Sequence, residues 1–497
     1  MDSLTLSVLL SEQAKKYPKK TCIKFENRKI SYSEINERVN LGAGGFISAG
    51  LRPRERAAIL MDNCPEYIVS YFSILRAGAI AVPLNTFLTA DEIIYILRDS
   101  GCCFLVYSDT FSSRVEHIRK NIQEVKVVTF RELPESHGRF ETGEDSDTAV
   151  LLYTSGTTGF PKGVMLTNRN LRTNAESCMK VMRLSDRDRI LLFLPLFHAF
   201  SFTVCVILPI LSGATIVLLK SVKPFSKIIQ SVIRDRITFF IGVPAIYNIL
   251  SKKKVNVFLR ALFRFLLSVR ACISGASALP ERTIHEFEKK FRVPLIEGYG
   301  LTEASPVVAV NPLYGERRPA SVGPPIPGVK AALLDDEGRR MSVGERGELI
   351  VSGDNVMKGY YHKQEETEEV LRDGWLYTGD VARIDEDGYI YIIDRKKDLI
   401  IVGGMNIYPR EVEDVMMQVP SVEECAMVGI PDGRGSEITA LFVKKKEHAL
   451  IDDDRIRKCL KGRVASYKIP KRIVFIEEFP KTATGKIKKN ELRKWKL

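Results

Sequence analysis

The sequence predicts an α/β fold in which a large, multi-layered N-terminal domain precedes a small α+β domain. Three observations support this prediction. The 497 residues exceed what a single hydrophobic core normally organises. Residues 1–394 alternate short apolar runs with amphipathic helical stretches, a pattern typical of layered sheets rich in parallel strands. After about Gly323, Asp-Gly turns separate short alternating segments, which predicts a small, barrel-like antiparallel subdomain.

The apolar runs are short enough to be buried strands. They lie at 57–61, 79–82, 104–107, 126–129, 216–219, 239–242 and 295–296. The longest apolar segment, 190–219, contains no Asp, Glu, Lys or Arg. Because Pro195, Pro209 and Gly213 interrupt it, we expect a buried strand, loop, helix and second strand there rather than a membrane span.

A charged run, Asp394–Asp398, separates the predicted strands 389–393 and 399–402. About 100 residues follow it, which is enough for a small independent domain. We therefore predict an N-terminal domain over 1–394, a hinge over 395–398 and a C-terminal domain over 399–497.

The bulk properties are those of an ordinary globular protein, with 45% hydrophobic and 27% charged residues. Nine cysteines without a C-x-x-C pair and six scattered histidines predict neither a metal cluster nor a disulfide framework. Asp2 stands where a signal peptide would be basic, so we expect a cytoplasmic protein. The net charge of +13 suits anionic small molecules, and no aromatic-interleaved basic patch indicates nucleic acid.

The run Tyr153–Gly163 gathers glycines, hydroxyl residues and a lysine directly after an apolar strand. Glycines let backbone N–H groups turn toward an anion, while the hydroxyls add donors and the lysine adds charge. A helical pattern begins beyond Asn168, so we expect a strand, a flexible phosphate-binding loop and a helix. The loop does not match the nucleoside-triphosphatase motif, because Pro161 and Gly163 replace its glycine and its hydroxyl residue.

This run instead resembles the phosphate loop of the AMP-forming adenylating enzymes, a family of acyl- and aryl-CoA synthetases, peptide-synthetase adenylation domains and luciferases. The resemblance is strongest to fatty-acid–CoA ligases, and it implies that ATP is a substrate. It assigns the ATP phosphates to Thr154, Ser155, Gly156, Thr157, Thr158, Gly159 and Lys162.

A second string, Glu297–Glu303, is specific to the same family and is complete here. Glycines on both sides of Tyr299 permit close approach to a flat ligand that the ring can stack against. Thr302 can donate to a phosphate, and Glu303 offers the carboxylate that Mg²⁺ prefers. Upstream, Ser274–Pro280 resembles the adenine-side turn. The resemblance assigns the nucleotide to Gly275, Ala276, Glu297, Gly298, Tyr299 and Gly300, with Ala276 where many members have glycine.

A third string, Trp375–Asp380, ends in a carboxylate after a tight turn, which suits the two hydroxyls of a ribose. The family's Thr-Gly-Asp motif implies that Asp380 binds the ATP ribose. By the same resemblance, Arg395 assists at the ribose and Ile392 lies near the nucleotide. Lys397 takes the family's hinge position, where many members have aspartate.

A fourth string, Pro480–Lys489, lies in a basic tail in which residue chemistry alone selects no single lysine. The family pattern P-x-T-x-x-G-K selects Lys486, and it implies that this lysine bridges the substrate carboxylate and the α-phosphate. The carboxylate then attacks the α-phosphorus of ATP and pyrophosphate leaves, with catalysis by positioning and electrostatics.

The resemblance also implies a second step, in which the small domain turns about Lys397 and withdraws Lys486. Gly403 and Gly404 then face the pantetheine arm of CoA, whose thiol attacks the acyl adenylate. ATP, Mg²⁺ and CoA are therefore the expected cosubstrates and metal.

The segment Leu194–Phe202 bears on the acid. Amino-acid-activating members have aspartate where this chain has His198, and an ammonium group would stay unpaired beside histidine. We therefore predict a plain carboxylic acid. His198 resembles the family's gate residue and Phe202 is a candidate for closing an acyl tunnel, with core packing of both as the alternative. The predicted substrate pocket also includes Gly242, Val243 and Gly275.

The segment 252–270 mixes large apolar residues with arginines such as Arg260 and Arg264. A buried helix with snorkelling arginines explains it most simply. The alternative hypothesis is peripheral contact with a membrane surface beside the acyl entrance. Together with the apolar pocket, this segment favours a medium- or long-chain fatty acid.

Three alternatives stay open at the level of sequence. An acyl-AMP ligase that loads a carrier protein would share every ATP motif, and an aryl-CoA ligase or luciferase-like enzyme is the second rival. A non-catalytic ligand-binding or scaffold protein belongs to a different class, and it would be expected to lack Glu303 or Lys486, both of which are present. Sequence leaves the acyl chain length and the oligomeric state open.

Overall fold

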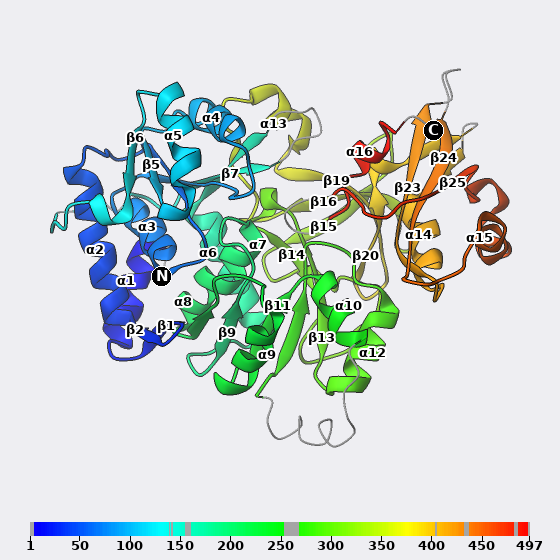
Figure 1. Ribbon diagram of the computed structural model, residues 1–497, viewed down its shortest axis with the longest axis horizontal. Helices are drawn as coiled ribbons and strands as arrows, with labels where there is room; N and C mark the ends of the chain where they lie inside the picture. Colours follow the sequence, from blue (N-terminus) through cyan, green and yellow to red (C-terminus); the bar gives the residue numbers. More distant parts are fainter. Residues whose placement is uncertain are drawn as a thin grey trace.

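The computed structural model shows a large body formed by the first four-fifths of the chain and a smaller unit formed by the C-terminal residues (Figure 1). It describes residues 4–138, 140, 143–154, 161–252, 268–402, 405–431, 437–481 and 486–495. The phosphate-loop residues 155–160, most of the basic segment (253–267) and the pair Gly403–Gly404 lie outside the described residues.

One part of the body is a seven-stranded sheet in the order β17-β8-β7-β4-β3-β5-β6, with β7, β4, β3, β5 and β6 parallel. Successive residues of β3 face opposite sides, so Ile59 enters the main core while Leu60 enters a second core beneath α4 and α5. The predicted strands are confirmed to within one residue at each end. The strands are β3 (Arg56–Leu60), β4 (Ile80–Pro83), β5 (Phe104–Tyr107), β6 (Lys126–Thr129), β7 (Thr148–Thr154), β8 (Lys162–Thr167) and β17 (Gly359–Tyr360).

The other large sheet has eight strands in the order β14-β13-β12-β11-β9-β10-β1-β2. It is parallel from β13 to β1 and antiparallel at both edges, so the carboxyl ends of its central strands meet along one edge. The predicted strands at 216–219, 239–242 and 295–296 are confirmed, and the last extends to Gly300. The strands are β1 (Thr21–Phe25), β2 (Arg28–Ser31), β9 (Arg189–Leu192), β10 (Thr215–Leu218), β11 (Phe239–Gly242), β12 (Ala271–Ser274), β13 (Leu295–Gly300) and β14 (Val307–Val310).

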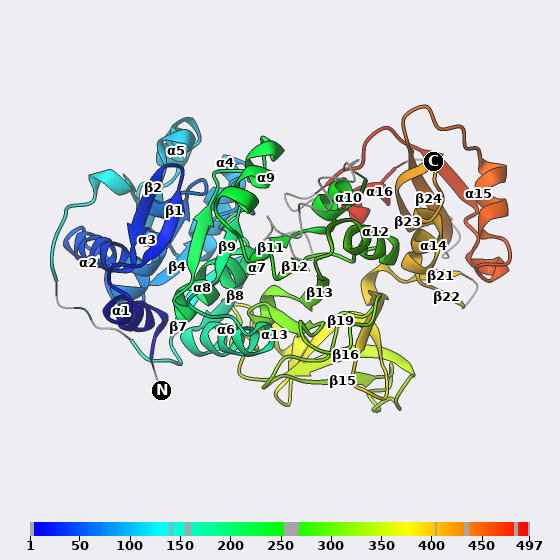
Figure 2. The ribbon, with the colours of Figure 1, turned by 90° about the horizontal axis from the view of Figure 1, so that it is seen from below.

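Helices cover these sheets, and their starts follow from local capping. The Ser31 side chain accepts from the backbone N–H of Glu34 at the start of α2, and Thr89 and Glu92 cap α4 reciprocally. Helices α1, α3, α6 and α8 pack in a layer that Figure 2 shows beside the sheets. The helices are α1 (Leu6–Lys16), α2 (Tyr32–Ser48), α3 (Pro65–Arg76), α4 (Ala90–Asp99), α5 (Ser112–Asn121), α6 (Asn168–Met182), α7 (Ala199–Phe202), α8 (Leu208–Ser212), α9 (Phe225–Arg234), α10 (Pro244–Lys252), α12 (Glu281–Phe291) and α13 (Gln364–Val370).

The apolar segment 190–219 folds as expected into buried strand, loop, helix and strand. It runs from β9 through α7, a π-helical turn (Thr203–Ile207) and α8 to β10, and its central residues are almost fully buried. Within the part of the chain that the structure describes, no helix combines the length and the apolar character needed to cross a membrane.

The predicted antiparallel subdomain is a five-stranded sheet that follows β14 in the chain. The turns at Asp336-Glu337-Gly338 and Asp387-Gly388 end in glycines with positive φ angles of 80° and 81°, which glycine tolerates without strain. The strands are β15 (Lys330–Leu334), β16 (Arg346–Ser352), β18 (Leu371–Arg372), β19 (Trp375–Ile384) and β20 (Ile390–Arg395).

The smaller unit begins after a short 3₁₀ turn, Lys396–Asp398, and has the predicted α+β composition. Its two hydrophobic cores contain only residues from Ile400 onward. The elements are β21 (Ile400–Val402), β22 (Met405–Ile407), α14 (Pro409–Met417), β23 (Val422–Pro431), β24 (Glu437–Lys445), α15 (Asp453–Leu460), β25 (Arg472–Phe475) and α16 (Lys489–Leu492).

One local prediction was wrong. The phosphate-loop region was expected to be a strand, a loop and a helix, but β8 lies between the loop and α6. It pairs antiparallel with β7, with Thr154 opposite Lys162. The two strands form a hairpin because the Val164 and Leu166 side chains are buried in an apolar core. Helix α6 begins only after Thr167, whose side chain caps it.

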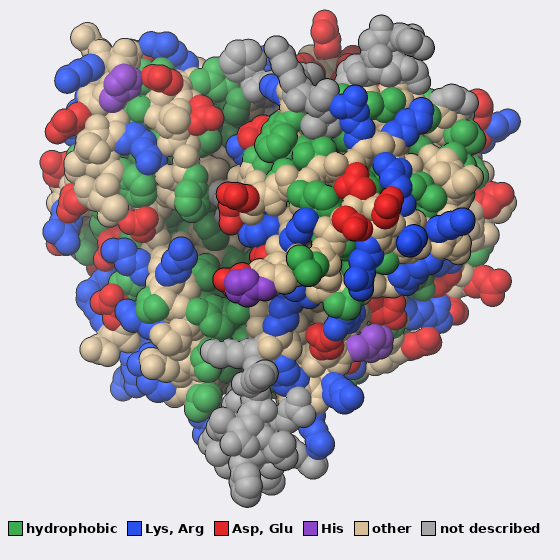
Figure 3. Space-filling model, turned by 45° about the vertical axis from the view of Figure 1, so that its right-hand side comes forward, with side chains coloured by type: hydrophobic (Ala, Val, Ile, Leu, Met, Phe, Trp, Pro, Cys, Tyr) green, Lys and Arg blue, Asp and Glu red, His purple; other side chains and the backbone are tan. Residues whose placement is uncertain are grey.

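Charge is mixed over the surface. On the face seen in Figure 3, Lys and Arg side chains of the described residues lie among Asp and Glu side chains. The net charge of +13 is therefore distributed on this face and does not form one uninterrupted basic field.

Candidate functional site

The candidate site lies where the central strands of the eight-stranded sheet end. Four segments leave this edge: the Leu194–Phe202 segment after β9, Val243 after β11, Gly275 and Ala276 after β12, and the Glu297–Glu303 string at the end of β13. The Gly275 N–H donates to the Gly242 carbonyl at 3.3 Å, which joins two of the turns. The crevice outside the carboxyl ends of parallel strands is where α/β sheets commonly bind ligands.

Backbone shape explains several small residues in these turns. At Gly300 an added Cβ would lie 2.0 Å from the Pro306 carbonyl oxygen, so no larger residue fits. At Gly275 it would lie 2.7 Å from the Phe200 ring. Ala276 has φ of +71°, the left-handed region that glycine adopts most easily. The alanine found here instead of the family's glycine therefore carries a conformational cost.

Asp380 is the buried centre of a polar cluster next to the β13 turn. It lies on β19, is 5% exposed and accepts a hydrogen bond from the Tyr299 hydroxyl. Arg395 pairs with it across the β19–β20 ladder, with Nε 3.3 Å from Oδ1. The Thr378 hydroxyl accepts from the Asp380 N–H at 3.1 Å and fixes the turn. The carboxylate is thus held in place by side chains from two neighbouring elements, β13 and β20.

Lys486 comes from the smaller unit and lies near the same cluster. Desolvation of its ammonium lowers the Lys486 pKa to about 8, with repulsion from Arg395 and Lys397 adding to the effect and Asp380 opposing it. The residue as a whole is exposed, and this solvation moderates the shift. Desolvation also lowers the His198 pKa to about 4, with the Lys486 charge as the second cause. His198 is therefore neutral at pH 7.

Lys397, in the turn between the body and the smaller unit, lies close to these groups. Burial lowers the Lys397 pKa, and the Arg395 charge contributes in the same direction. Ile392 pairs with Ala382 on β19, and its carbonyl accepts from Arg410 at 2.9 Å. The predicted ribose-side residues are therefore gathered at the boundary between the two units.

Glu303 follows β13 in the chain and lies in the short 3₁₀ helix Thr302–Ala304. Its Oε1 accepts from the Tyr360 hydroxyl at 3.0 Å, and its carbonyl accepts from the Met357 N–H at 2.8 Å. Lys162, 15% exposed, lies 5.3 Å from the centroid of the Tyr360 ring. Glu366 on α13 is 4.0 Å from the same ammonium. Tyr360 thus joins two residues that the sequence assigned to metal and phosphate.

Glu297 differs from the other predicted nucleotide residues because its carboxylate is enclosed. It is 4% exposed, and its Oε1 accepts from the Leu279 N–H at 3.0 Å. Burial raises the Glu297 pKa to about 7, while the Arg410 charge opposes this rise. The carboxylate therefore stabilises the turn after β12 through its hydrogen bond with the Leu279 N–H.

The side chains present fit ATP with a magnesium ion. Tyr299 offers a flat ring, Asp380 and Arg395 offer ribose partners, and the phosphate side has Thr302, Lys162 and the hard carboxylate oxygens of Glu303. In addition, the buried hydroxyls of Ser274 and Ser305 have no hydrogen-bond partner among the described residues. Buried hydroxyls are normally satisfied, so these two favour a polar ligand between the turns.

The predicted acid pocket is crowded by aromatic rings. Phe202 is 6% exposed and packs against Tyr71 and Tyr67, with ring centroids at 4.1 Å and 6.0 Å. Phe200 overlies Gly275, as described above. Both phenylalanines lie on α7, which begins at Ala199, directly after the N-cap residue His198. A layer of aromatic side chains therefore directly follows the candidate gate residue in the chain.

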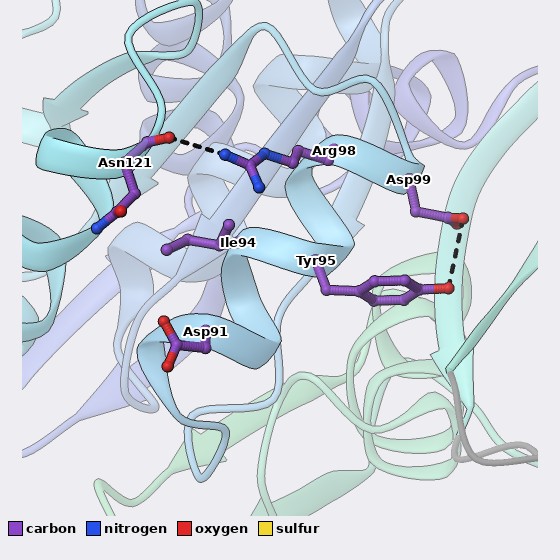
Figure 4. Close-up of a pocket in the computed structure, with 6 residues that line it drawn as sticks. All are labelled: Asp91, Ile94, Tyr95, Arg98, Asp99 and Asn121. Atoms are coloured by element: carbon purple, nitrogen blue, oxygen red, sulfur yellow. Dashed lines mark hydrogen bonds between the residues drawn. The ribbon is translucent and has the colours of Figure 1, made fainter.

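A surface hollow of about 580 Å³ lies away from these residues, along α4 (Figure 4). Asp91, Ile94, Tyr95, Arg98, Asp99 and Asn121 line it. None of the motif residues belongs to its lining. Two hydrogen bonds link its lining to the residues of the Tyr153–Gly163 run: the Tyr153 hydroxyl donates to Asp99 at 2.6 Å, and the Tyr95 hydroxyl donates to the Pro161 carbonyl at 3.4 Å.

Sequence reasoning missed two residues at the site. Tyr360 follows the β17 glycine, and only its pairing with β8 brings it to Glu303. Phe200 lies within the Leu194–Phe202 segment, and its position over Gly275 depends on the meeting of two distant segments. The Gly-Tyr-Tyr string at 359–361 was the available signal for the first. Ser155, Gly156, Thr157, Thr158, Gly159, Gly403 and Gly404 lie outside the described residues.

Comparison with known proteins places this geometry in context. A family model described as AMP-binding enzyme matches residues 10–361, and one described as AMP-binding enzyme C-terminal domain matches residues 411–486. A long-chain-fatty-acid–CoA ligase from Bacillus subtilis is 36% identical, covering 98% of this chain and 94% of its own length. A feruloyl-CoA synthase from an Amycolatopsis species is 35% identical, covering 97% of each chain.

Among solved structures, ATP-bound MatB from Rhodopseudomonas palustris superposes with a TM-score of 0.91 at 30% identity, covering 99% of this chain and 98% of that one. The same protein without ligand superposes with a lower TM-score of 0.80. As a whole, this chain therefore superposes more closely on the ATP-bound crystal than on the ligand-free one.

Proposed function

This chain belongs to the family of AMP-binding enzymes, and from that membership we propose that it joins a medium- or long-chain fatty acid to CoA. The general activity follows from the family and from its CoA-ligase relatives: it is an AMP-forming acid–thiol ligase that uses ATP, Mg²⁺ and CoA. The identity of the acid and the roles of individual residues are the proposal.

The observation that supports these roles best is the convergence on Asp380. Lys486 from the smaller unit, Arg395 from β20 and Tyr299 from β13 all lie close to this one carboxylate. These three groups are far apart in the sequence. Their convergence supports a nucleotide held between the two units, with the ribose on Asp380 and the adenine beside Tyr299.

In the first step, the acid carboxylate attacks the α-phosphorus of ATP and pyrophosphate leaves. Lys486 stabilises the charge that develops between carboxylate and α-phosphate, and Lys162 with the phosphate loop holds the departing pyrophosphate. Thr302 donates to a phosphate oxygen, and Glu303 is the residue that would hold Mg²⁺, which would screen the phosphate charge when bound. We assign His198, which is neutral at pH 7, to the carboxylate end of the acid pocket.

In the second step, the smaller unit turns about Lys397, and the loop at 403–404 meets the pantetheine arm. The CoA thiolate attacks the acyl carbon and AMP leaves. We propose 1–394, 395–398 and 399–497 as body, hinge and mobile domain. The separate hydrophobic cores on the two sides of the hinge support this division.

The test is an acid series in two assays, one for pyrophosphate release and one for thioester formation. We expect release with saturated acids of medium or long chain and a thioester only when CoA is added. Release without thioester formation would favour an acyl-AMP ligase that loads a carrier protein. Inactivity with every acid would support a non-catalytic ligand-binding protein.

An aryl acid is the second candidate, because Phe200 covers Gly275 and because a feruloyl-CoA synthase is among the relatives. A flat acid needs less depth beyond the aromatic layer than an alkyl chain does. Replacing Phe200 with alanine separates the two candidates. If the natural acid is a fatty acid, the variant should accept longer chains, whereas if it is an aryl acid, loss of the stacking ring should weaken binding.

Contact with a membrane surface through the basic segment 252–270 is a further part of the proposal. Liposome flotation with anionic lipid tests it, with Arg260→Glu/Arg264→Glu as the charge-reversed variant. Flotation that the variant does not reduce would contradict it. The oligomeric state is measured in the same preparations by light scattering.

A further inference from the structure

The segment 353–361 connects the turn that carries Glu303 with the strand that begins at Lys162, the two parts of the site assigned to magnesium and phosphate. Asn355 donates to the Ala304 carbonyl at 2.9 Å, next to Glu303. The N–H groups of Lys358 and Tyr361 donate to the carbonyls of Met165 and Gly163 on β8, at 3.0 Å and 2.8 Å. The segment therefore spans from the turn that carries Glu303 to the strand that begins with Lys162.

Tyr360 lies at the middle of this bridge and contacts both residues with its side chain. A tyrosine hydroxyl beside a carboxylate donates its proton, so Glu303 Oε1 is the acceptor of the 3.0 Å bond. The face of the same ring lies under the Lys162 ammonium at 5.3 Å, within the range of a cation–π contact. The Tyr360 side chain thus contacts the Glu303 carboxylate through its hydroxyl and the Lys162 ammonium through the face of its ring.

The Tyr360 ring has little freedom to move. Its backbone N–H donates to the Thr367 hydroxyl at 2.9 Å, and the Thr367 hydroxyl donates to the Lys363 carbonyl at 2.7 Å. Gly359 has φ of +145°, and an added Cβ there would lie 2.8 Å from the Thr367 side chain. These contacts fix the start of β17 against α13, and they fix the direction in which the ring leaves the strand.

We propose that Tyr360 is a positioning residue. Its hydroxyl fixes Glu303 in the orientation needed to hold magnesium, and its ring positions Lys162 beside that carboxylate. The inference rests on the proposed role of Glu303 as the magnesium-binding carboxylate. A carboxylate that is restrained before the ion arrives loses less freedom on binding it, so magnesium and ATP reinforce each other more strongly. Removal of the hydroxyl should weaken this reinforcement and leave the contacts of ATP without the ion intact.

The experiment measures binding of a non-hydrolysable ATP analogue by titration calorimetry, once with saturating Mg²⁺ and once with a chelator. The ratio of the two dissociation constants is the magnesium coupling. For Tyr360→Phe we expect this ratio to fall by about tenfold, the effect of one hydrogen bond to a charged group. The affinity without Mg²⁺ should stay within about twofold, because the ring still seats Lys162.

Tyr361→Phe is the matched control. It removes the same hydroxyl from the next residue, whose ring packs against His362 rather than Glu303. We expect its coupling to equal that of the unaltered protein. Tyr360→Leu, which removes the ring as well, should additionally weaken binding without Mg²⁺ by about threefold.

Glu303→Gln separates the inference from the proposed function. If this variant keeps the full coupling, Glu303 does not hold magnesium and the proposed function fails at that residue. If Glu303→Gln abolishes the coupling while Tyr360→Phe leaves it unchanged, only the positioning role of Tyr360 is overturned. General destabilisation would lower both affinities together and leave their ratio unchanged, and that outcome also contradicts the inference.

Discussion

The large body and the smaller unit have separate hydrophobic cores, and polar contacts link them. A continuous hydrophobic core runs through the body from Leu6 to Ile390, while the cores of the smaller unit start at Ile400. Among the described residues, no hydrophobic cluster joins the two. They meet through polar contacts such as Arg346 with Glu411 at 2.9 Å and Arg410 with the Ile392 carbonyl at 2.9 Å.

This difference in packing indicates that the body has a fixed geometry, whereas the smaller unit can change its position. Contacts within the body cannot be exchanged for water without opening a core, so the turns around Tyr299 and Asp380 keep their geometry. Exposed ion pairs and hydrogen bonds are exchanged for water at low cost, so the position of the smaller unit can change. In the proposed function, the body therefore defines where ATP lies, and the position of the smaller unit determines when Lys486 is beside it.

The strongest test of this division is Lys486→Ala. We expect acid-dependent pyrophosphate release to fall by about 10³-fold, because the variant lacks the cation nearest the developing charge. Thioester formation from a supplied acyl adenylate should change by less than about threefold. The two half-reactions are measured separately, and an equal loss in both would show that Lys486 is not specific to the first step.

The next effect is a dependence on pH. Because the Lys486 pKa is lowered to about 8, its charged fraction falls as pH rises above 8. The kcat/KM for ATP in the first half-reaction should therefore fall by about tenfold per pH unit above that value. Lys486→Arg should lack this fall, because arginine stays protonated. The same alkaline fall in the arginine variant would assign it to another group.

A smaller effect is expected for Arg346→Ala, which removes one contact between body and smaller unit. We expect about a threefold slower first half-reaction and an unchanged second one, since an exposed ion pair contributes little. Arg339→Ala is the control, because its partners Asp335 and Glu337 lie in the same subdomain of the body. Equal effects of the two variants would remove Arg346 as a determinant of the arrangement.

The smallest effect concerns the body alone. Burial raises the Glu297 pKa from 4.5 to about 7, so the folded state holds this proton more tightly than the unfolded state. The resulting stability is complete below pH 4.5 and is lost as pH rises through 7. Glu297→Gln should therefore unfold at a temperature about 2 °C higher at pH 8 and lack this pH dependence. Calorimetry that gives the same temperature for both proteins at pH 8 would contradict this.

Much of the fold could be predicted because its signals are local. Alternation and apolar runs marked the strands β3 to β6 almost to the residue, and Asp-Gly turns marked the five-stranded sheet. β8 was missed because Lys162–Thr167 is a short strand that directly follows a glycine-rich turn and precedes a helix cap. Only its pairing with β7 makes it a strand.

The candidate site shows the same limit. Asp380, Glu303 and Lys486 belong to strings that resemblance could assign one by one. Tyr360 and Phe200 act through contacts between segments far apart in the chain, which no local pattern encodes. The depth available to the acid depends on such contacts as well, so the sequence indicated its class more readily than its length.

Because separate cores lie on either side of residues 395–398, the covalent connection between the two units matters for the site. A short linker keeps Lys486 near Asp380 at an effective concentration in the millimolar range. Expressed as two polypeptides, body and smaller unit would each retain its own core, yet they would meet through weak polar contacts only. In the proposed function, the short turn Lys396–Asp398 between β20 and the smaller unit therefore raises the local concentration of Lys486 at Asp380, and its length matters to the site as much as the side chains do.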